Sequence, residues 1–363
     1  MSEAEELGAL RQQIDSIDQQ LQHLLNERAK CAMAVADVKH KYAAPGEKVV
    51  FYRPEREAQV LRKVMERNTG PLPAEGVAKL FREVMSQCLA LEEPLKVAFL
   101  GPEGTFTQQA AVKHFGQAAQ GVAQASIGDV FREVERGHAN YGVVPVENST
   151  EGLVTHTHDY FIDSPLKVIG EVELRIRHSL LSQSENQPIQ RIYSHGQSLG
   201  QCRRWLDQHY PNAERIAVSS NGEAARRASQ EAGSAAIASE FAAELYNLVV
   251  IAANIEDRTD NTTRFLIIGP EAIGPSGKDK TSVIIASRNQ PGALYHVLEP
   301  FHKAGISLTR IETRPARSGT WNYVFFIDFE GHYQDQDITP VMDELKQVAM
   351  DFKWLGSYPK AVL

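Results

Sequence analysis

Cysteine, long apolar runs and excess positive charge are all scarce in this sequence of 363 residues. The three cysteines, Cys31, Cys88 and Cys202, are too few and too scattered for a disulfide framework or a zinc site, so we expect reduced thiols. No stretch approaches the roughly 20 consecutive apolar residues that a membrane span needs. The acidic start, MSEAEELGAL, also lacks the basic residues and apolar run of a signal peptide, which predicts a cytoplasmic protein that contacts no membrane.

The formal net charge of −8 argues against general nucleic-acid binding. An anionic ligand must then be held by a local basic cluster rather than by the overall field. The composition, 42% hydrophobic and 23% charged, is that of an ordinary globular protein without disordered tracts. The length predicts two or three domains.

The apolar pattern changes twice along the chain and divides it into three parts. Residues 1–93 have helical periodicity, residues 94–273 alternate strand, loop and helix, and residues 278–363 read strand, helix, strand, strand, helix, strand. The last order is that of a ferredoxin-like fold. The segment GPSGKDK, residues 274–280, is the expected linker between the second and third domains.

Residues 4–40 carry a heptad-like apolar stripe and predict one long helix. A second helix is expected from about Pro54 to before Asn68, and a third from about Ala74 to Glu93. Three helices with such an exposed stripe have too little mutual surface to bury it. We therefore expect this domain to dimerise.

Basic residues interrupt the stripe of the first helix. Arg28 takes a position on the stripe, where a buried guanidinium requires an anionic partner. Lys39 lies about 16 Å further along nearly the same face, so both side chains can reach one small anion. Arg11 lies about 25 Å before Arg28 and can share that site only if a second subunit brings it. The alternative is that these residues are solvated charges beside a dimer seam.

The segments ALRQQIDSIDQQLQHLLNERAKCAMAVADVKHK, EREAQVL and FREVMSQCLALE resemble the all-helical chorismate mutase family. The resemblance implies an intertwined dimer in which one subunit completes the other's site. It also implies that the rearrangement of chorismate to prephenate needs neither cofactor nor metal. The matching site positions are Arg11, Arg28, Lys39, Arg56, Glu57, Cys88 and Glu92.

The chemistry of this rearrangement fits those residue types. Chorismate is a dianion that reacts in a unimolecular step, so the protein must hold a compact conformer and stabilise charge on the ether oxygen. The three arginines can clamp carboxylates. Glu57 can accept a hydrogen bond from the ring hydroxyl, while Lys39 and Glu92 can donate to the ether oxygen.

Four motifs of the second domain, GPEGTFT, VENSTEG, SHGQSLGQC and TDNTTRF, are weak signals singly because each fits an ordinary strand-to-helix turn or loop. Together they resemble prephenate dehydratase, which implies two α/β lobes like those of type II periplasmic binding proteins, with prephenate in the cleft between them. The functional positions implied are Thr105, Glu147, Asn148, Ser149, Ser194, Gln201, Thr263, Arg264 and Phe265.

The resemblance and the chemistry of the reaction together suggest roles for three of these residues. Thr263 would aim its hydroxyl at the leaving hydroxyl of prephenate, and Glu147, if buried and protonated, is the alternative acid. Arg264 would anchor a carboxylate. His156, His158 and Asp159 do not have the spacing of a metal site, so we expect no metal.

In the third domain, GALYHV and RIETRP resemble motifs of the ACT regulatory domain of prephenate dehydratases. The resemblance implies that phenylalanine binds as an effector between paired sensor domains. It leaves open whether dimers pair into tetramers. The implied effector contacts are Gly292, Ala293, Leu294, Glu312, Thr313, Arg314 and Pro315.

A rival interpretation of the whole chain is an amino-acid-sensing binding protein, with a two-lobed ligand domain and a helical dimerisation module. Arg28 on the stripe argues against a purely passive helical module. Production of phenylpyruvate from chorismate separates the two hypotheses.

Overall fold

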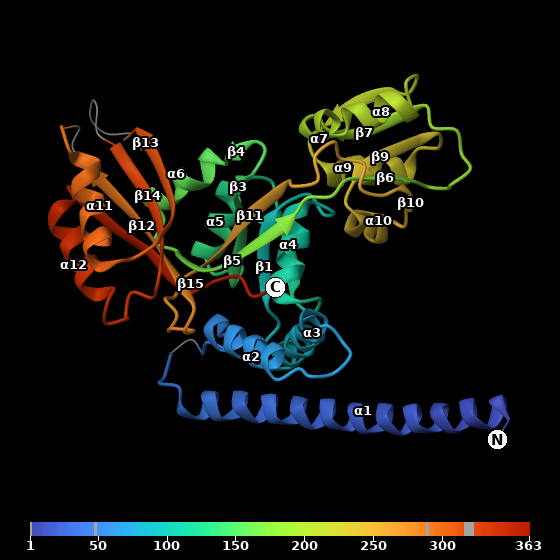
Figure 1. Ribbon diagram of the computed structural model, residues 1–363, viewed down its shortest axis with the longest axis horizontal. Helices are drawn as coiled ribbons and strands as arrows, with labels where there is room; N and C mark the ends of the chain where they lie inside the picture. Colours follow the sequence, from blue (N-terminus) through green and yellow to red (C-terminus); the bar gives the residue numbers. More distant parts are fainter. Residues whose placement is uncertain (1, 47–48, 288–289, 316–322) are drawn as a thin grey trace.

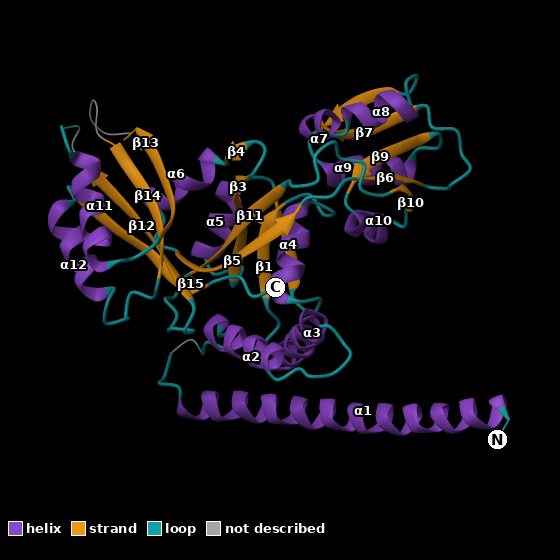
Figure 2. Cartoon of the chain, viewed as in Figure 1, coloured by secondary structure: helices purple, strands orange, loops and turns teal. Residues whose placement is uncertain are grey.

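The computed structural model describes residues 2–46, 49–287, 290–315 and 323–363. A helical domain, a two-lobed α/β domain and an α+β domain follow one another along the chain, and they meet near its C-terminus (Figure 1). Figure 2 shows that strands are confined to the second and third domains. None of the helices in the described parts combines the length and apolarity needed to cross a membrane.

The helical domain consists of α1 (Glu3–Tyr42), α2 (Pro54–Glu66) and α3 (Ala74–Glu92). The prediction of one long first helix is confirmed, and Pro54 takes the first-turn position expected of it. Leu61 and Val64 of α2 pack against Ala78 of α3 in a small buried core. By contrast, the stripe on α1 is exposed in this chain: Leu7, Leu10, Ile14, Ile17, Leu21, Leu24, Val35 and Val38.

The first lobe of the second domain is a sheet of order β2-β1-β3-β11-β5, with β4 paired to β3. Where helices cover the sheet, its strands carry apolar residues at alternate positions or in continuous runs. These residues form two buried apolar cores. The strands are β1 (Lys96–Leu100), β2 (Gln120–Gln124), β3 (Tyr141–Asn148), β4 (Gly152–Leu153), β5 (Lys167–Arg175) and β11 (Thr262–Gly269). The helices are α4 (Phe106–Phe115), α5 (Ile127–Glu135) and α6 (Thr155–Asp163).

The second lobe is a sheet of order β10-β6-β9-β7-β8. Its strands are β6 (Ser179–Ser182), β7 (Arg191–His195), β8 (Glu214–Val218), β9 (Ser234–Ala238) and β10 (Val249–Ala252). Its helices are α7 (Gly196–Gln201), α8 (Arg203–His209), α9 (Asn221–Gln230) and α10 (Glu240–Tyr246).

The chain crosses between the lobes twice, at residues 176–178 and 253–261. The two crossovers are hydrogen-bonded to each other: Ile176 N donates to Asn261 O at 2.8 Å, and Ile255 N donates to His178 O at 2.9 Å. Residues far apart in sequence are thereby fixed side by side at the base of the cleft between the lobes.

The third domain is an antiparallel sheet of order β13-β14-β12-β15, covered on one face by two helices. This order confirms the predicted ferredoxin-like fold, although the last strand is longer than the short one expected near WLGSY. The elements are β12 (Asp279–Ser287), α11 (Ala293–Ala304), β13 (Leu308–Pro315), β14 (Tyr323–Glu330), α12 (Thr339–Val348) and β15 (Asp351–Pro359).

The expected linker of residues 274–280 is a hydrogen-bonded turn rather than a bare connection. Asp279 accepts hydrogen bonds from the hydroxyl and the backbone N–H of Ser276 at 2.6 and 2.9 Å. Arg62 of α2 donates to the carbonyl oxygens of Ser276 and Lys278 at 3.1 and 3.0 Å. The turn therefore ties the helical domain to the junction of the other two domains.

Candidate active sites

Three of the residues predicted for the helical site, Arg28, Lys39 and Glu92, come together along the C-terminal half of α1. Glu92 ends α3, and the charges of Lys39 and Arg28 act on its carboxyl. Burial raises the pKa of Glu92, and these two cations only partly offset that effect. Burial likewise lowers the pKa of Lys39, whose Nζ donates to Val50 O at 3.0 Å and lies 5.1 Å from the Phe51 ring centre. A carboxyl and an ammonium group thus sit together in a partly dehydrated site.

The other predicted residues of the helical domain are more dispersed. Cys88 is buried on α3, one turn before Glu92, whereas Arg56 is exposed on α2. The N-terminal part of α1 projects past α2 and α3 (Figure 1). Arg11 is exposed and precedes Lys39 by 28 positions on this helix, about 42 Å at 1.5 Å per residue. Within one chain, therefore, Arg11 does not reach the Lys39 and Glu92 groups.

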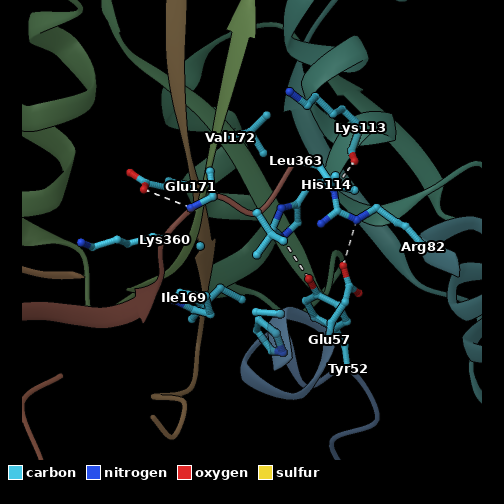
Figure 3. Close-up of a pocket in the computed structure, with 16 residues that line it drawn as sticks. Tyr52, Glu57, Arg82, Lys113, His114, Ile169, Glu171, Val172, Lys360 and Leu363 are labelled. Atoms are coloured by element: carbon cyan, nitrogen blue, oxygen red, sulfur yellow. Dashed lines mark hydrogen bonds and ion pairs between the residues drawn. The ribbon is translucent and has the colours of Figure 1, made fainter. Parts of the chain in front are cut away.

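Glu57 does not match its expected role. It lies 3.2 Å from Nε of Arg82 and lines a small cavity of about 30 Å³ against the second domain and Leu363 (Figure 3). In the same cavity, Tyr52 Oη lies 2.9 Å from His114 Nε2, and burial and then Arg82 lower the pKa of His114 to about 3. The structure gives no support for a hydrogen bond from a substrate hydroxyl to Glu57. Its carboxylate is paired with Arg82, and the cavity that it lines faces the second domain.

A cleft of about 520 Å³ lies between the two lobes of the second domain. It is lined by four of the predicted residues, Thr105, Asn148, Gln201 and Thr263. Asn148 joins two of the strand ends, since its Nδ2 donates to Thr263 Oγ1 at 2.7 Å. Several further lining residues were not foreseen: Glu151, His156, His178, His195, Gln197, Ser198, Asn221 and Asn261. The polar residue types of the NSTE and TDN segments were the available signal for Glu151 and Asn261.

An anion in the cleft would meet the N-terminal ends of helices rather than the expected basic cluster. Among the described residues that line it, none is Lys or Arg, but Thr105, Thr155 and Ser220 lie at the N-termini of α4, α6 and α9. Free N–H groups and the helix dipole make such ends favourable for carboxylates. Arg204 and Arg258 line an adjoining hollow that shares the Gln201 wall of the cleft.

Ser149, Ser194 and Phe265 do not line the cleft. Ser149 Oγ accepts from Thr262 N at 2.9 Å, and buried Ser194 donates to Ile237 O at 2.9 Å. Phe265 is part of the apolar core of the first lobe. These three residues hold the strands in place, so the structure does not support substrate contact by them.

Arg264 and Glu147 face the third domain rather than the cleft. Arg264 is 7% exposed and donates to Glu171, Asp328 and Tyr358 at 3.0, 2.6 and 2.9 Å. Glu147 is ion-paired with Arg310 of β13. Neither Arg264, the predicted carboxylate anchor, nor Glu147, the alternative acid, therefore lines the cleft.

The predicted effector residues lie at one end of the third-domain sheet. Ser287 at the end of β12 pairs with Tyr323, which pairs with Pro315 at the end of β13. Gly292, with φ of 80°, starts α11 just after β12, while Ala293 is half-buried and Leu294 exposed. The segment of Glu312, Thr313 and Arg314 runs along β13 toward the same end.

The residues weighed as a metal group also take part in contacts between the second and third domains. Arg314 donates to Asp159 of α6 at 3.0 Å, and His158 packs edge-on against Phe326 with ring centres 4.9 Å apart. His156, in contrast, lines the cleft. The two histidines therefore face different surroundings.

The comparisons with known proteins agree with this three-domain architecture. Family models match for chorismate mutase type II at residues 10–93, prephenate dehydratase at residues 97–273 and the ACT domain at residues 281–348. A bifunctional chorismate mutase/prephenate dehydratase of Pseudomonas aeruginosa is 59% identical, with 100% of both chains covered.

Two solved structures cover most of the chain. Prephenate dehydratase of Arthrobacter aurescens in complex with L-Phe is 33% identical, with a TM-score of 0.67 over 73% of this chain and 90% of that one. A structure described as GqqA, a novel type of quorum quenching acylases, is 27% identical, with a TM-score of 0.67 over 74% of this chain and 98% of that one. The relative that matches from end to end decides between these descriptions, and the chain belongs to the bifunctional chorismate mutase/prephenate dehydratase family.

Proposed function

We propose that this chorismate mutase/prephenate dehydratase performs its first reaction with Arg28, Lys39 and Glu92 of one subunit and Arg11 of another. The proposal rests on the coupling of Glu92 to Lys39 and Arg28, together with the unburied apolar stripe of α1. Pairing of two α1 helices would bury that stripe and bring the second subunit's Arg11 to the site.

In this site the arginines, including Arg56, would hold the two carboxylates of chorismate. Cys88 would pack beside the substrate, and Lys39 and protonated Glu92 would donate to the ether oxygen as its C–O bond breaks. The raised pKa of Glu92 supports a protonated carboxyl, because only that form can donate.

The dehydratase reaction consumes one proton: prephenate dianion and a proton give phenylpyruvate, carbon dioxide and water. The bond from the ring to its carboxylate breaks, and that electron pair aromatises the ring as the hydroxyl leaves. Thr263 is our candidate for the group that donates to this hydroxyl. The observation that carries this assignment is the hydrogen bond from Asn148 Nδ2, which occupies a lone pair of Thr263 Oγ1 and leaves its O–H free to donate.

Phenylalanine is the proposed effector, bound at the α11 and β13 end of the sheet between paired ACT domains. Two ion pairs between domains support a route from this site to the cleft. Glu147, next to Asn148, pairs with Arg310 of β13, and Arg264, next to Thr263, pairs with Asp328 of β14. A shift of the ACT sheet would therefore move the strands that carry Thr263 and Asn148.

One assay of the purified chain tests both activities. Chorismate should be converted to phenylpyruvate, whose appearance is followed by absorbance, with prephenate as a transient intermediate. Phenylalanine should slow the second step. Binding of phenylalanine without any turnover of chorismate or prephenate would instead favour the amino-acid-sensing alternative. Sedimentation should detect a dimer, and the cytoplasmic location stays a prediction from the sequence.

A further inference from the structure

A chain of hydrogen bonds runs from Thr263 across the base of the cleft to a buried histidine that the proposed mechanism leaves without a role. It passes from Thr263 to Asn148, to Asn261 on one crossover, to Gln201 in the second lobe, and ends at His178 on the other crossover. Asn148 Nδ2 donates to Asn261 Oδ1 at 2.8 Å, and Asn261 Nδ2 donates to Gln201 Oε1 at 3.2 Å. His178 Nε2 lies 2.8 Å from the same Gln201 oxygen.

The direction of every bond in this chain is fixed by two backbone N–H groups. Those of Thr150 and Glu151 donate to Asn148 Oδ1 at 2.9 and 3.0 Å, and a backbone N–H cannot reverse its role. Asn148 must therefore present its amide nitrogen to Thr263 and Asn261. Asn261 in turn presents its oxygen to Asn148 and its nitrogen to Gln201.

The same logic assigns the tautomer of His178. Gln201 Oε1 is an acceptor, and Gln201 Nε2 faces the carboxylate of Glu151 at 3.3 Å, so His178 Nε2 must carry the hydrogen. His178 is 1% exposed, and its Nδ1 has no hydrogen-bond partner among the described residues. Protonation of Nδ1 would bury an unpaired donor. The neutral Nε2–H form is thus the one that fits, and burial lowers the pKa of His178 in agreement.

We propose that His178, as the neutral Nε2–H tautomer, is a positioning residue of the dehydratase site. By donating to Gln201 it holds that amide in position across the cleft, and the Asn261 and Asn148 amides, whose orientation the backbone N–H groups already set, carry this restraint to the Thr263 hydroxyl. The location of His178 and Asn261 on the two crossovers makes this chain part of the hinge between the lobes. The inference rests on the proposed donor role of Thr263.

Three substitutions separate the hydrogen bond from the packing of the ring. His178→Phe keeps a ring of similar size, including its edge-on contact with Phe106, but has no donor. His178→Asn places an N–H near the position of Nδ1, whereas His178→Gln places one near Nε2. We expect dehydratase kcat to fall about tenfold or more in the Phe and Asn variants, and to stay within about threefold of wild type in the Gln variant.

Thermal unfolding of the same chains reports folding of the second domain, and His209→Phe, an exposed ring substitution in the second lobe, is the matched control. A His178→Phe enzyme with normal kcat would overturn the proposal. So would a change confined to KM, or a Gln variant as impaired as the Phe variant.

Combination with Thr263→Val distinguishes this inference from the donor role on which it rests. If His178 acts through Thr263, His178→Phe should cost little in a chain that already carries Thr263→Val. A full additional loss in the double variant refutes the positioning role. Normal dehydratase turnover in Thr263→Val alone refutes the donor role instead.

Discussion

Asp328 Oδ2 of the ACT domain lies 2.6 Å from Nη1 of Arg264, the residue that directly follows Thr263 on β11. Successive residues of a strand point to opposite sides, so one strand presents Thr263 to the cleft and Arg264 to the regulatory sheet. The neighbouring strand β3 repeats the pattern with Asn148 and Glu147. Only the two paired strands β3 and β11 therefore lie between these cleft residues and the regulatory domain.

The first prediction concerns the proposed donor. Thr263→Val keeps the shape of the side chain but removes the hydroxyl, so dehydratase kcat should fall by about 100-fold or more. Mutase activity and thermal unfolding should remain close to those of the wild type. A parallel loss of both activities and of stability would make Thr263 a structural residue.

Arg310→Gln tests the route from the effector site to the cleft. It removes the ion pair with Glu147 but leaves the cleft residues in place. We expect dehydratase turnover without phenylalanine to be nearly unchanged, and the phenylalanine concentration for half-inhibition to rise about fivefold or more.

The control for that experiment is Lys346→Gln, which makes the same change of charge in the same domain. Within the described part of the chain, the ion-pair partner of Lys346 is Asp343 on the exposed face of α12. Its inhibition curve should match that of the wild type. If Arg310→Gln gives that same curve, the ion pair does not transmit the effector signal.

The mutase should depend on pH through Glu92. Burial raises the pKa of this carboxyl, and only the protonated form donates to the ether oxygen, so mutase kcat/KM should rise as pH falls from about 8 toward 5. Glu92→Gln, a permanent donor, should flatten that profile. Glu75→Gln at the exposed start of α3 should leave it unchanged. A flat wild-type profile would point to Lys39 or a water as the donor.

Subunit mixing tests whether two chains share each mutase site. Arg11→Ala and Arg28→Ala chains should each be nearly inactive alone. Random exchange of equal amounts makes half of the dimers mixed, and each mixed dimer has one intact site, so about a quarter of wild-type mutase activity should return. No recovery after demonstrated subunit exchange would contradict a shared site.

The C-terminal tail should stabilise the helical domain. Val362 and Leu363 pack against the α2–α3 core of Leu61, Val64 and Ala78, and Ala361 N donates to Glu171 Oε1 at 3.3 Å. Deletion of residues 361–363 should lower the free energy of unfolding of this domain by about 2–3 kcal/mol, measured by denaturation.

Lys360→Gln is the matched control for the tail, since it breaks a partly exposed ion pair with Glu330 and should cost less than about 1 kcal/mol. Equal stability of the deleted and control chains would show that the tail contacts are not stabilising. Removal of residues 278–363 would also strip this tail, so point substitutions at Arg310 test regulation more cleanly.

The local sequence pattern by itself determined many of the helices and strands of this protein. The apolar spacing of residues 4–40 predicted α1, Pro54 marked the start of α2, and the order of strands and helices after residue 278 predicted the ferredoxin-like domain. These features follow from neighbours in sequence, whose spacing alone determines which of them share a helix or strand face. The resemblance of four motifs located the cleft residues Thr105, Asn148, Gln201 and Thr263.

Tertiary structure alone decided which residues of each motif face the cleft. Thr263 and Arg264 are adjacent in one motif, and no local signal distinguishes the residue that faces the cleft from the one that faces the ACT domain. Glu57 pairs with Arg82 across a helix pair, and His178 and Asn261 share the Gln201 side-chain oxygen only because the two crossovers lie side by side. Such partners are 25 to more than 80 residues apart in the chain, so their contacts, and hence their roles, depend on how whole domains pack.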